Sequence, residues 1–408
     1  MNTERDFQEF GKIKRADVYK GKDLAAHLTR TDEGVRFEYT AEYLASELPP
    51  IAHSLPKSSA PQTINSGGVP SFFAGLLPEG RRLNALRRAI KTSADDELSM
   101  LLAVGRDVIG DARIVPTGDL PNPIKPLVEV TKTFEEINFT DLVADFAEID
   151  KVGLPGVQEK VSATRIWVPA SREGSQFILK LGSSEHPFVI ENEYYFLGIA
   201  RKSLKNVVRA EIVHDFDGES GLLVTRFDRI LDAIGNPISI AVEDACQVLN
   251  RWPADKYHIS SEAIVIGLSK VCASPKLAAR ELYRQFCFAW FTGNGDLHAK
   301  NISIISTQDG EWKISPAYDL PSTLPYGDTS LALTIGGKKI GHSRRSLVEF
   351  GMSVGLSEKL ATKVMDEILD STAHVIEDLR GGSLPFDQQK ISDLIAELRH
   401  RRRTGFPT

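Results

Sequence analysis

The sequence predicts an α+β protein with more than one domain, and three observations support this prediction. A chain of 408 residues is too long for one simple core, so two or three packed lobes are expected. Strand patterns recur before residue 240, whereas the residues from about Glu243 onward follow mostly helical patterns. In that helical part, four apolar residues share one face of a predicted helix: Ala278, Leu282, Phe286 and Ala289. We therefore expect a part that contains β-sheet, followed by a mainly helical lobe.

The N-terminal part is expected to contain a small antiparallel meander. Apolar and polar residues alternate from Ala16 to Tyr39, which is the periodicity of strands with one buried face. A short helix is predicted over 41–48, because two prolines follow it. A longer helical pattern begins at Pro70 and continues past Ile90, and Pro78 is expected to kink or divide it. Another helix is predicted over 98–104.

A proline-rich linker separates this part from the rest of the chain. Four prolines lie within eleven residues, a density that favours extended chain: Pro116, Pro121, Pro123 and Pro126. Three strand signals follow the linker, over 161–168, 177–181 and 221–227, and a helix is predicted around 191–202. The predicted domains are therefore 1–120, 121–240 and 241–408.

The composition indicates an ordinary globular protein of the cytoplasm. A net charge of −6 argues against non-specific nucleic-acid binding by the chain as a whole. No run of about 18 apolar residues occurs, so no membrane span is expected. The three cysteines, Cys246, Cys272 and Cys287, lack the spacing of zinc ligands, and an odd, sparse set fits a reducing compartment. Buried packing is the expected role of Cys287.

One glycine-bearing turn carries the strongest functional signal. Residues 293–301 read Gly-Asn-Gly-Asp-Leu-His-Ala-Lys-Asn and follow the apolar helix. Phosphoryl transfer to a hydroxyl needs a carboxylate such as Asp296 to take the proton, and Asn301 follows at the Asp-to-Asn spacing of the protein-kinase catalytic loop. Asp319 comes after a strand-like segment and is a candidate magnesium ligand. A single acid in a turn is often only structural, so the order and spacing of the three residues carry this prediction.

A lysine and a second glycine-bearing segment supply what nucleotide phosphates require. Lys180 ends an apolar strand-like run, where it can hold phosphates with Glu193 as its helix partner. The alternative is an edge-strand lysine that maintains solubility. Residues 152–160 form a glycine-bearing loop whose backbone N–H groups can approach phosphates. That loop matches neither Gly-x-Gly-x-x-Gly nor the Walker A pattern.

These motifs, in this order, resemble those of the HipA-like kinase family. Members carry a Gly-x-Gln-x-Lys loop, a strand lysine, an Asn-Glu-Tyr helix, a hinge, a Glu-Asp-x-Cys-Gln segment, a catalytic Asp-x-His-x-Lys-Asn and a Tyr-Asp pair. The matching residues are Gly156 to Lys160, Lys180, Asn192 to Tyr194, Thr225 to Asp228, Glu243 to Gln247, Asp296 to Asn301, and Tyr318-Asp319. The N-terminal part is similar to the family's own N-terminal subdomain over Phe72 to Glu79 and Gly105 to Pro116.

The resemblance implies a protein-kinase-like two-lobe fold with an extra N-terminal α+β subdomain and a mainly helical C-terminal lobe. It also implies a serine/threonine protein kinase that uses ATP and magnesium (Mg2+) and acts as the toxin of a type II toxin–antitoxin system. The expected partners are a HipB-like helix-turn-helix antitoxin, operator DNA reached through that antitoxin, and a protein substrate. In this family the known substrates are aminoacyl-tRNA synthetases, whose phosphorylation halts translation and promotes persistence.

The resemblance further implies roles for individual residues. Asp296 would be the catalytic base, and Asn301 and Asp319 would be the metal ligands. ATP contacts are expected from Pro155, Gly156, Val157, Gln158, Glu159, Lys160, Lys180, Thr225, Arg226, Phe227, His298, Lys300 and Tyr318. Of these, Lys180 would contact the phosphates, and the backbone of residues 225–227 would contact the adenine.

Two positions depart from the family pattern. Gly153 stands where better-known members carry a serine whose autophosphorylation inactivates the kinase. Autoinhibition at that position is therefore impossible, although Ser162 lies nearby in the sequence. Thr225 replaces the glutamate of the hinge, which is compatible with adenine contacts made by backbone groups.

Two other functions fit parts of the pattern. A small-molecule kinase of the aminoglycoside-phosphotransferase type shares the Asp-x-x-x-x-Asn core, but the N-terminal subdomain argues against it. A catalytically silent co-repressor would bind its antitoxin and DNA, but intact Lys180, Asp296, Asn301 and Asp319 argue against silence. The basic run Arg399–Arg403 either contacts operator DNA or is a solvated helix end.

Overall fold

The computed structural model describes residues 7–65, 67–93, 95–122, 128–130, 134–142, 166–172, 175–182, 185–231 and 237–406. These residues form a mixed structure of sheets and helices, and the chain divides into two compact units. The first unit comprises Met1–Pro126, Thr140–Val157 and Asp228–Pro253. The second unit comprises Leu127–Phe139, Gln158–Phe227 and Ala254–Thr408. The division into three domains at residues 120 and 240 stays a prediction.

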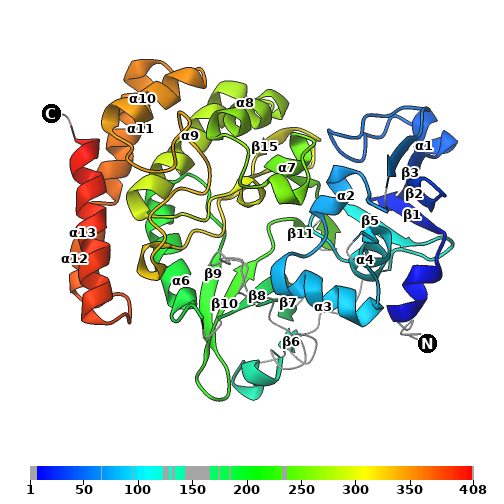
Figure 1. Cartoon of the computed structure of the whole chain (residues 1–408), viewed down its shortest axis with the longest axis horizontal. Coiled ribbons are helices and arrows are strands. Elements are labelled where there is room, and N and C mark those ends of the chain that lie inside the picture. Colours follow the sequence, from blue (N-terminus) through cyan, green and yellow to red (C-terminus); the bar gives the residue numbers. More distant parts are fainter. Residues whose placement is uncertain are drawn as a thin grey trace. The chain divides into compact units, whose positions relative to one another are not determined.

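An antiparallel sheet of five described strands organises the first unit (Figure 1). Its order is β4-β3-β2-β1-β5, with β1 (Arg15–Lys20), β2 (Asp23–Arg30), β3 (Gly34–Tyr39), β4 (Gln62–Asn65) and β5 (Ala112–Pro116). The meander predicted over 16–39 is confirmed as β1 to β3. In β3, Val35, Phe37 and Tyr39 are buried and the residues between them are exposed, because alternate side chains of a strand point to opposite faces.

Helices complete the core of the first unit. They are η1 (Phe7–Lys12), α1 (Ala41–Ala45), α2 (Ser71–Gly75), α3 (Gly80–Ile90) and α4 (Glu97–Val104). The helical pattern that begins at Pro70 is divided at Pro78, as predicted, because α2 ends before that proline and α3 begins after it. The helix predicted over 98–104 is confirmed as α4. Buried side chains such as Leu28, Phe73 and Leu101 join the sheet and helices in one apolar cluster.

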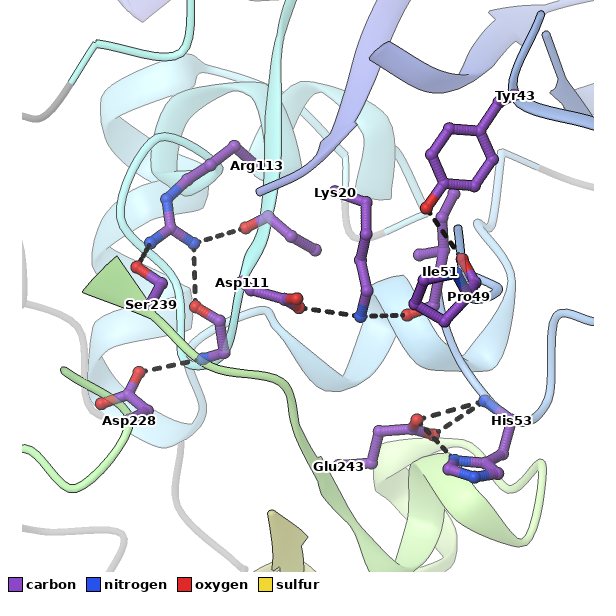
Figure 2. A network of polar contacts seen from close by, with 12 residues as sticks. Lys20, Tyr43, Pro49, Ile51, His53, Asp111, Arg113, Asp228, Ser239 and Glu243 are labelled. Atoms are coloured by element: carbon purple, nitrogen blue, oxygen red, sulfur yellow. Dashed lines mark hydrogen bonds and ion pairs between the residues drawn. The ribbon is translucent and has the colours of Figure 1, made fainter. Parts of the chain in front are cut away.

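The segment Asp228–Pro253 belongs to the first unit, although the chain passes through the second unit before reaching it. It contains β11 (Arg229–Leu231), β12 (Pro237–Ser239), β13 (Val242–Asp244) and α7 (Ala245–Val248). Figure 2 shows the Glu243 carboxylate accepting the His53 backbone N–H at 3.1 Å, with His53 Nδ1 at 2.8 Å. Asp228 accepts the Gly110 N–H at 2.9 Å in the same network. Polar contacts therefore fasten this segment to the loops beside the sheet.

The motif Glu243 to Gln247 has a structural explanation in these contacts. Asp244 caps α7 through the Gln247 N–H, and the Gln247 side chain bonds back to the Asp244 N–H. Gln247 also donates to the carbonyl of Phe72 at 2.8 Å. The motif thus links α7 to α2, which carries part of the Phe72 to Glu79 signature.

A second sheet organises the first part of the second unit. Its order is β6-β7-β8-β10-β9 among the described residues, with β6 (Val128–Val130), β7 (Ile166–Arg172), β8 (Ser175–Leu181), β9 (Ala210–His214) and β10 (Ser220–Thr225). Helix α6 (Val189–Ser203) connects β8 to β9 and buries Phe196, Leu197 and Ala200. The strands predicted over 177–181 and 221–227 and the helix around 191–202 are confirmed. Of the strand predicted over 161–168, residues 161–165 lie outside the described residues.

The rest of the second unit is mainly helical. Its longer helices are α8 (Ser261–Val271), α9 (Pro275–Thr292), α10 (Arg344–Ser353), α11 (Glu358–Ser371), α12 (Val375–Arg380) and α13 (Gln388–Gly405). A hairpin of β14 (Ser303–Ser306) and β15 (Trp312–Ile314) follows α9. Helix α9 packs against α8, α10, α11 and α13 (Figure 1), and its four predicted core residues are buried. No helix in the described ranges has both the length and the apolar character that crossing a bilayer requires.

Candidate active site

The end of α9 determines the position of Asp296. Gly293 ends the helix in the left-handed region, with φ of 72°, which glycine adopts without strain. The Asn294 side chain then accepts the Asp296 N–H at 2.8 Å, which closes a tight turn. Asp296 itself is fully buried. The short helix η5 (Ala299–Asn301) follows and leads into β14.

Asn301 joins the two predicted acids. Its Nδ2 donates to the Asp296 carbonyl at 2.9 Å and to Asp319 Oδ2 at 3.0 Å. Both amide hydrogens are used in these bonds, so Oδ1 is the atom of the side chain that remains to bind a cation. Asn301 therefore joins the backbone of Asp296, five residues earlier in the chain, to the carboxylate of Asp319.

Lys180 lies between two buried carboxylates. Its Nζ donates to Glu193 Oε1 at 2.7 Å and to Asp319 Oδ1 at 3.0 Å. Strand β8 supplies the lysine, α6 supplies Glu193, and Asp319 follows β15. Removing one partner of a buried pair typically costs several kcal/mol, because the remaining charge is left in a medium of low polarity. The three residues thus couple the sheet, α6 and the helical region.

The segment before Asp319 is fixed by backbone hydrogen bonds. Ser315 N–H donates to the Ser303 carbonyl at 2.9 Å, and Ala317 pairs with the chain near Val207. Asp319 itself has a φ of 55°, which is uncommon for a residue other than glycine. Aspartate and asparagine tolerate this region better than most residues do. The backbone therefore turns sharply where the carboxylate meets Lys180 and Asn301.

The donor set fits a divalent cation. Magnesium prefers carboxylate, amide and phosphate oxygens, and Asp319 and Asn301 supply oxygens of these types within one buried cluster. The Lys180 ammonium beside them fits the negative charge of nucleotide phosphates. The same cluster thus has suitable groups for a cation and for phosphates.

The predicted hinge residues lie at the end of β10. The backbone N–H of Thr225 donates to the Arg209 carbonyl at 2.9 Å, and that of Arg226 donates to the Gln176 carbonyl at 3.0 Å. The Phe227 ring lies 5.6 Å from the Tyr318 ring, centroid to centroid. Two of the three hinge N–H groups are therefore engaged within the protein itself.

Three further predicted residues lie around the turn at Gly293–Asp296. His298 is buried, its ring contacts the Tyr257 ring edge to face, and its backbone N–H donates to the Asp296 carbonyl at 2.8 Å. Tyr318 donates its hydroxyl to the Lys300 carbonyl at 2.8 Å. These contacts hold the loop that contains Asp296. Residues 155–160, together with Gly153 and Ser162, lie outside the described residues.

Two side chains reach the site without having been assigned a role from the sequence. Asn192, next to Glu193 on α6, bonds to the backbone of Ser322. Thr323, four residues after Asp319, bonds to the backbone of Gly295. Asn192 is part of the Asn-Glu-Tyr motif, which gave it no role, and the only signal for Thr323 was its position after the predicted metal ligand. The backbone groups of Ser322 and Gly295 to which they bond are not revealed by a sequence motif.

Known proteins match this chain over most of its length. Residues 16–115 match the model of the HipA N-terminal domain, and residues 152–376 match that of the HipA-like C-terminal domain. The chain is 30% identical to "Putative kinase Y4dM" of Sinorhizobium fredii over 341 residues, which cover 76% of each chain. It is 25% identical to the serine/threonine-protein kinase toxin HipA of Shewanella oneidensis, with 83% of each chain covered.

A solved structure shows the same fold. The HipA chain in a complex of Shewanella oneidensis HipA, HipB and operator DNA matches with a TM-score of 0.75 at 21% identity, covering 95% of this chain and 96% of that chain. The second family model alone spans more than half of the 408 residues. The chain therefore belongs to the HipA-like kinase family.

Proposed function

We propose that this chain is an ATP-dependent serine/threonine protein kinase that acts as the toxin of a toxin–antitoxin pair. The observation that carries the proposal is the buried cluster of Lys180, Asp319 and Asn301, with Asn301 also bonded to the backbone of Asp296. A lysine, an acid, an asparagine and a second acid, in this order along the chain, are the groups that protein kinases use for phosphoryl transfer.

Each residue has a proposed role in the transfer. Asp296 orients the acceptor hydroxyl and takes its proton as the hydroxyl oxygen bonds to the γ-phosphorus of ATP and ADP leaves. Asn301 and Asp319 hold Mg2+, and Lys180 contacts the phosphates while Glu193 orients the lysine. When bound, Mg2+ neutralises negative charge on the phosphate oxygens.

The relatives support the proposed partners. The Shewanella oneidensis HipA structure contains HipB and operator DNA. By analogy we propose a helix-turn-helix antitoxin as the partner of this chain, with operator DNA reached through it. We further propose that the acceptor is a protein of translation, such as an aminoacyl-tRNA synthetase, whose phosphorylation arrests growth.

The proposal is tested with Asp296→Ala and a matched control. Asp309→Ala changes an exposed acid in the glycine turn between β14 and β15, so it removes the same group outside the site. Each variant is incubated with radiolabelled ATP, Mg2+ and a lysate of antitoxin-free cells, and each is expressed without antitoxin. Asp296→Ala is expected to lose at least about 100-fold in labelling and to relieve growth arrest, whereas Asp309→Ala behaves as wild type. Arrest that persists in Asp296→Ala would instead support a binding function.

A further inference from the structure

The four residues after Asp319 are buried and bonded on two sides. Leu320, Pro321, Ser322 and Thr323 are each buried, and their partners belong to α6 and to the catalytic turn at Gly293–Asp296. We refer to residues 320–323 as the strut. Every contact described for it lies within the second unit.

Asn192 fastens the strut to α6. It is fully buried, its Oδ1 accepts the Ser322 N–H at 3.0 Å, and its Nδ2 donates to the Ser322 carbonyl at 2.9 Å. Moving Ser322 would break two buried hydrogen bonds at once, and each buried group left unpaired is costly. The next residue, Glu193, pairs with Lys180. Adjacent positions of α6 therefore hold the lysine and the strut.

Thr323 fastens the strut to the catalytic turn. Its backbone N–H donates to the Gly293 carbonyl at 2.8 Å, and its Oγ1 accepts the Gly295 N–H at 3.0 Å. The Thr323 hydroxyl donates its proton to a backbone carbonyl, and the carbonyl of Asp328 lies 2.9 Å from Oγ1. Because Gly295 directly precedes Asp296, the Thr323 hydroxyl holds the backbone one residue from the candidate base.

The glycines of the turn leave the space that this contact requires. A Cβ on Gly293 would lie 2.4 Å from the Leu324 side chain. A Cβ on Gly295 would lie 2.5 Å from Thr323 Oγ1 and 2.5 Å from the Ser330 carbonyl oxygen. Real Cβ atoms essentially never approach so closely. Because these two glycines have no Cβ, the strut and Leu324, which directly follows it, can pack against the turn. The same glycines allow the turn itself to form.

We propose that Asn192 and Thr323 are positioning residues for phosphoryl transfer, which hold Asp296 and Asp319 at their working separation through the strut. The proposal rests on the kinase function proposed above. Asp319 is joined to the strut by the chain, and Asp296 is joined to it through Gly295. A displacement on the order of 1 Å in a catalytic arrangement can lower the rate about 100-fold, so neither residue needs to touch the substrate.

Thr323→Val tests the contact to the turn. Valine keeps the branched shape but removes the acceptor of the Gly295 N–H. With ATP, Mg2+ and myelin basic protein as the acceptor, kcat is expected to fall about 10- to 100-fold, while KM for ATP changes less than about threefold. Thr323→Ser retains the hydroxyl and is expected to stay within about threefold of wild type. A valine variant within about twofold of wild type, or a serine variant as impaired as the valine variant, overturns the role of Thr323.

Asn192→Asp tests the contact to α6. Aspartate keeps the acceptor of the Ser322 N–H and loses the donor to its carbonyl. The Mg2+ concentration at half-maximal activity is expected to rise about tenfold, because Asp319 is less firmly placed. Tyr283→Phe is the control, because it also removes a buried hydrogen bond to a backbone carbonyl, in this case the carbonyl of Ala361. It should leave kcat and the Mg2+ requirement unchanged. If Asn192→Asp has the kcat and the Mg2+ requirement of wild type, both measured per folded molecule, the proposed role of Asn192 is overturned.

An activity-independent measurement separates this inference from the kinase function. The Gly295 amide is expected to exchange its hydrogen at least about tenfold faster in Thr323→Val than in wild type, because its acceptor is lost. If wild type transfers no phosphate to any acceptor, the kinase function fails, and the exchange rate alone then decides whether the strut holds the turn. Unchanged exchange at Gly295 overturns the strut.

Discussion

Asp319 occupies a backbone conformation that most residues avoid. Its φ of 55° places it in the left-handed region, which costs an ordinary residue roughly 1 kcal/mol or more. Lys180 and Asn301 each bond to one of its carboxylate oxygens and offset that cost. The conformation and the two bonds together direct the carboxylate at the predicted metal ligand Asn301. Both the backbone conformation of Asp319 and the bonds of its carboxylate therefore contribute to the effect of a substitution at this position.

Substitution of Asp319 separates the two contributions. Asp319→Asn keeps tolerance of the left-handed region and one acceptor for Lys180, so it should lose less free energy of unfolding than Asp319→Ala does. Its kcat should fall at least about 100-fold, because the charge of the proposed metal ligand is lost. Asp319→Ala should unfold with roughly 2 kcal/mol less free energy than Asp319→Asn, as measured by urea denaturation. Equal stability of the two variants would show that neither the tolerance of the left-handed region nor the bond to Lys180 stabilises the fold.

At this same scale, the sequence predicted some residues of the site and missed others. Asn301 was predictable because its distance from Asp296 along the chain is short and fixed by a turn. Lys180 and Asp319 were predictable because Lys180 lies near the end of the apolar strand β8 and Asp319 follows the strand β15. The contacts of Asn192 and Thr323 were not predictable, since both bond to backbone groups whose positions depend on the complete fold.

Helices with an apolar face were the most predictable elements. The helix α9 buries the face predicted from three- and four-residue spacing, together with Cys287, whose pKa is raised to about 12 by burial. Pro78 divides a predicted helix because proline lacks an N–H and clashes with the preceding turn. The 3-10 segment at Ala299–Asn301 was not predicted, because its short length leaves no periodic pattern.

The basic end of α13 contains both buried and exposed arginines. Arg401 is buried and donates to the Trp290 carbonyl at 2.9 Å and to the Thr329 carbonyl at 2.6 Å, while Arg402 donates to the Leu369 carbonyl at 2.9 Å. These two arginines attach α13 to neighbouring segments. Arg399 and Arg403 are exposed, and their contact with operator DNA stays a prediction.

Arg401→Met tests the attachment of α13. Methionine fills much of the space but cannot donate, so two carbonyls and the partner Glu397 lose their bonds to the guanidinium. The free energy of unfolding is expected to fall by about 3 kcal/mol in urea denaturation. Arg399→Met, at an exposed position of the same helix, is expected to change it by less than about 0.5 kcal/mol. Similar losses in both variants would mean that the contacts of Arg401 contribute little.

The chain as a whole folds as two units that do not follow the order of the sequence. The segment Asp228–Pro253 belongs with the N-terminal sheet through bonds such as those from His53 to Glu243 and from Arg113 to Ser239. Sequence patterns predicted the strands but not this grouping, because pairings between distant segments leave no local signal. Urea denaturation of the whole chain consequently contains contributions from both units, and hydrogen exchange resolves one unit from the other.

Acid should destabilise the second unit through His342. Burial, together with the nearby charges of Arg401 and Lys338, lowers the pKa of His342 from 6.5 to about 4, against smaller opposing effects of Glu262 and of a hydrogen bond to the Lys338 backbone. Between these two values the unfolded chain binds the proton that the folded chain excludes. Stability is therefore complete above pH 6.5 and decreases as the pH falls towards 4.

The expected loss from this residue is about 2 kcal/mol between pH 7 and pH 5. His342→Phe keeps a ring against Trp290 but cannot titrate. Between pH 7 and pH 5 this variant should therefore lose about 2 kcal/mol less stability than wild type does. Hydrogen exchange of the α9 amides, converted to the free energy of opening, measures this in the second unit alone. His400→Phe at an exposed position is the control and should retain the wild-type pH dependence. A His342→Phe variant that loses as much stability at pH 5 as wild type would show that other groups govern acid sensitivity, because the buried imidazole is the only group that this substitution removes.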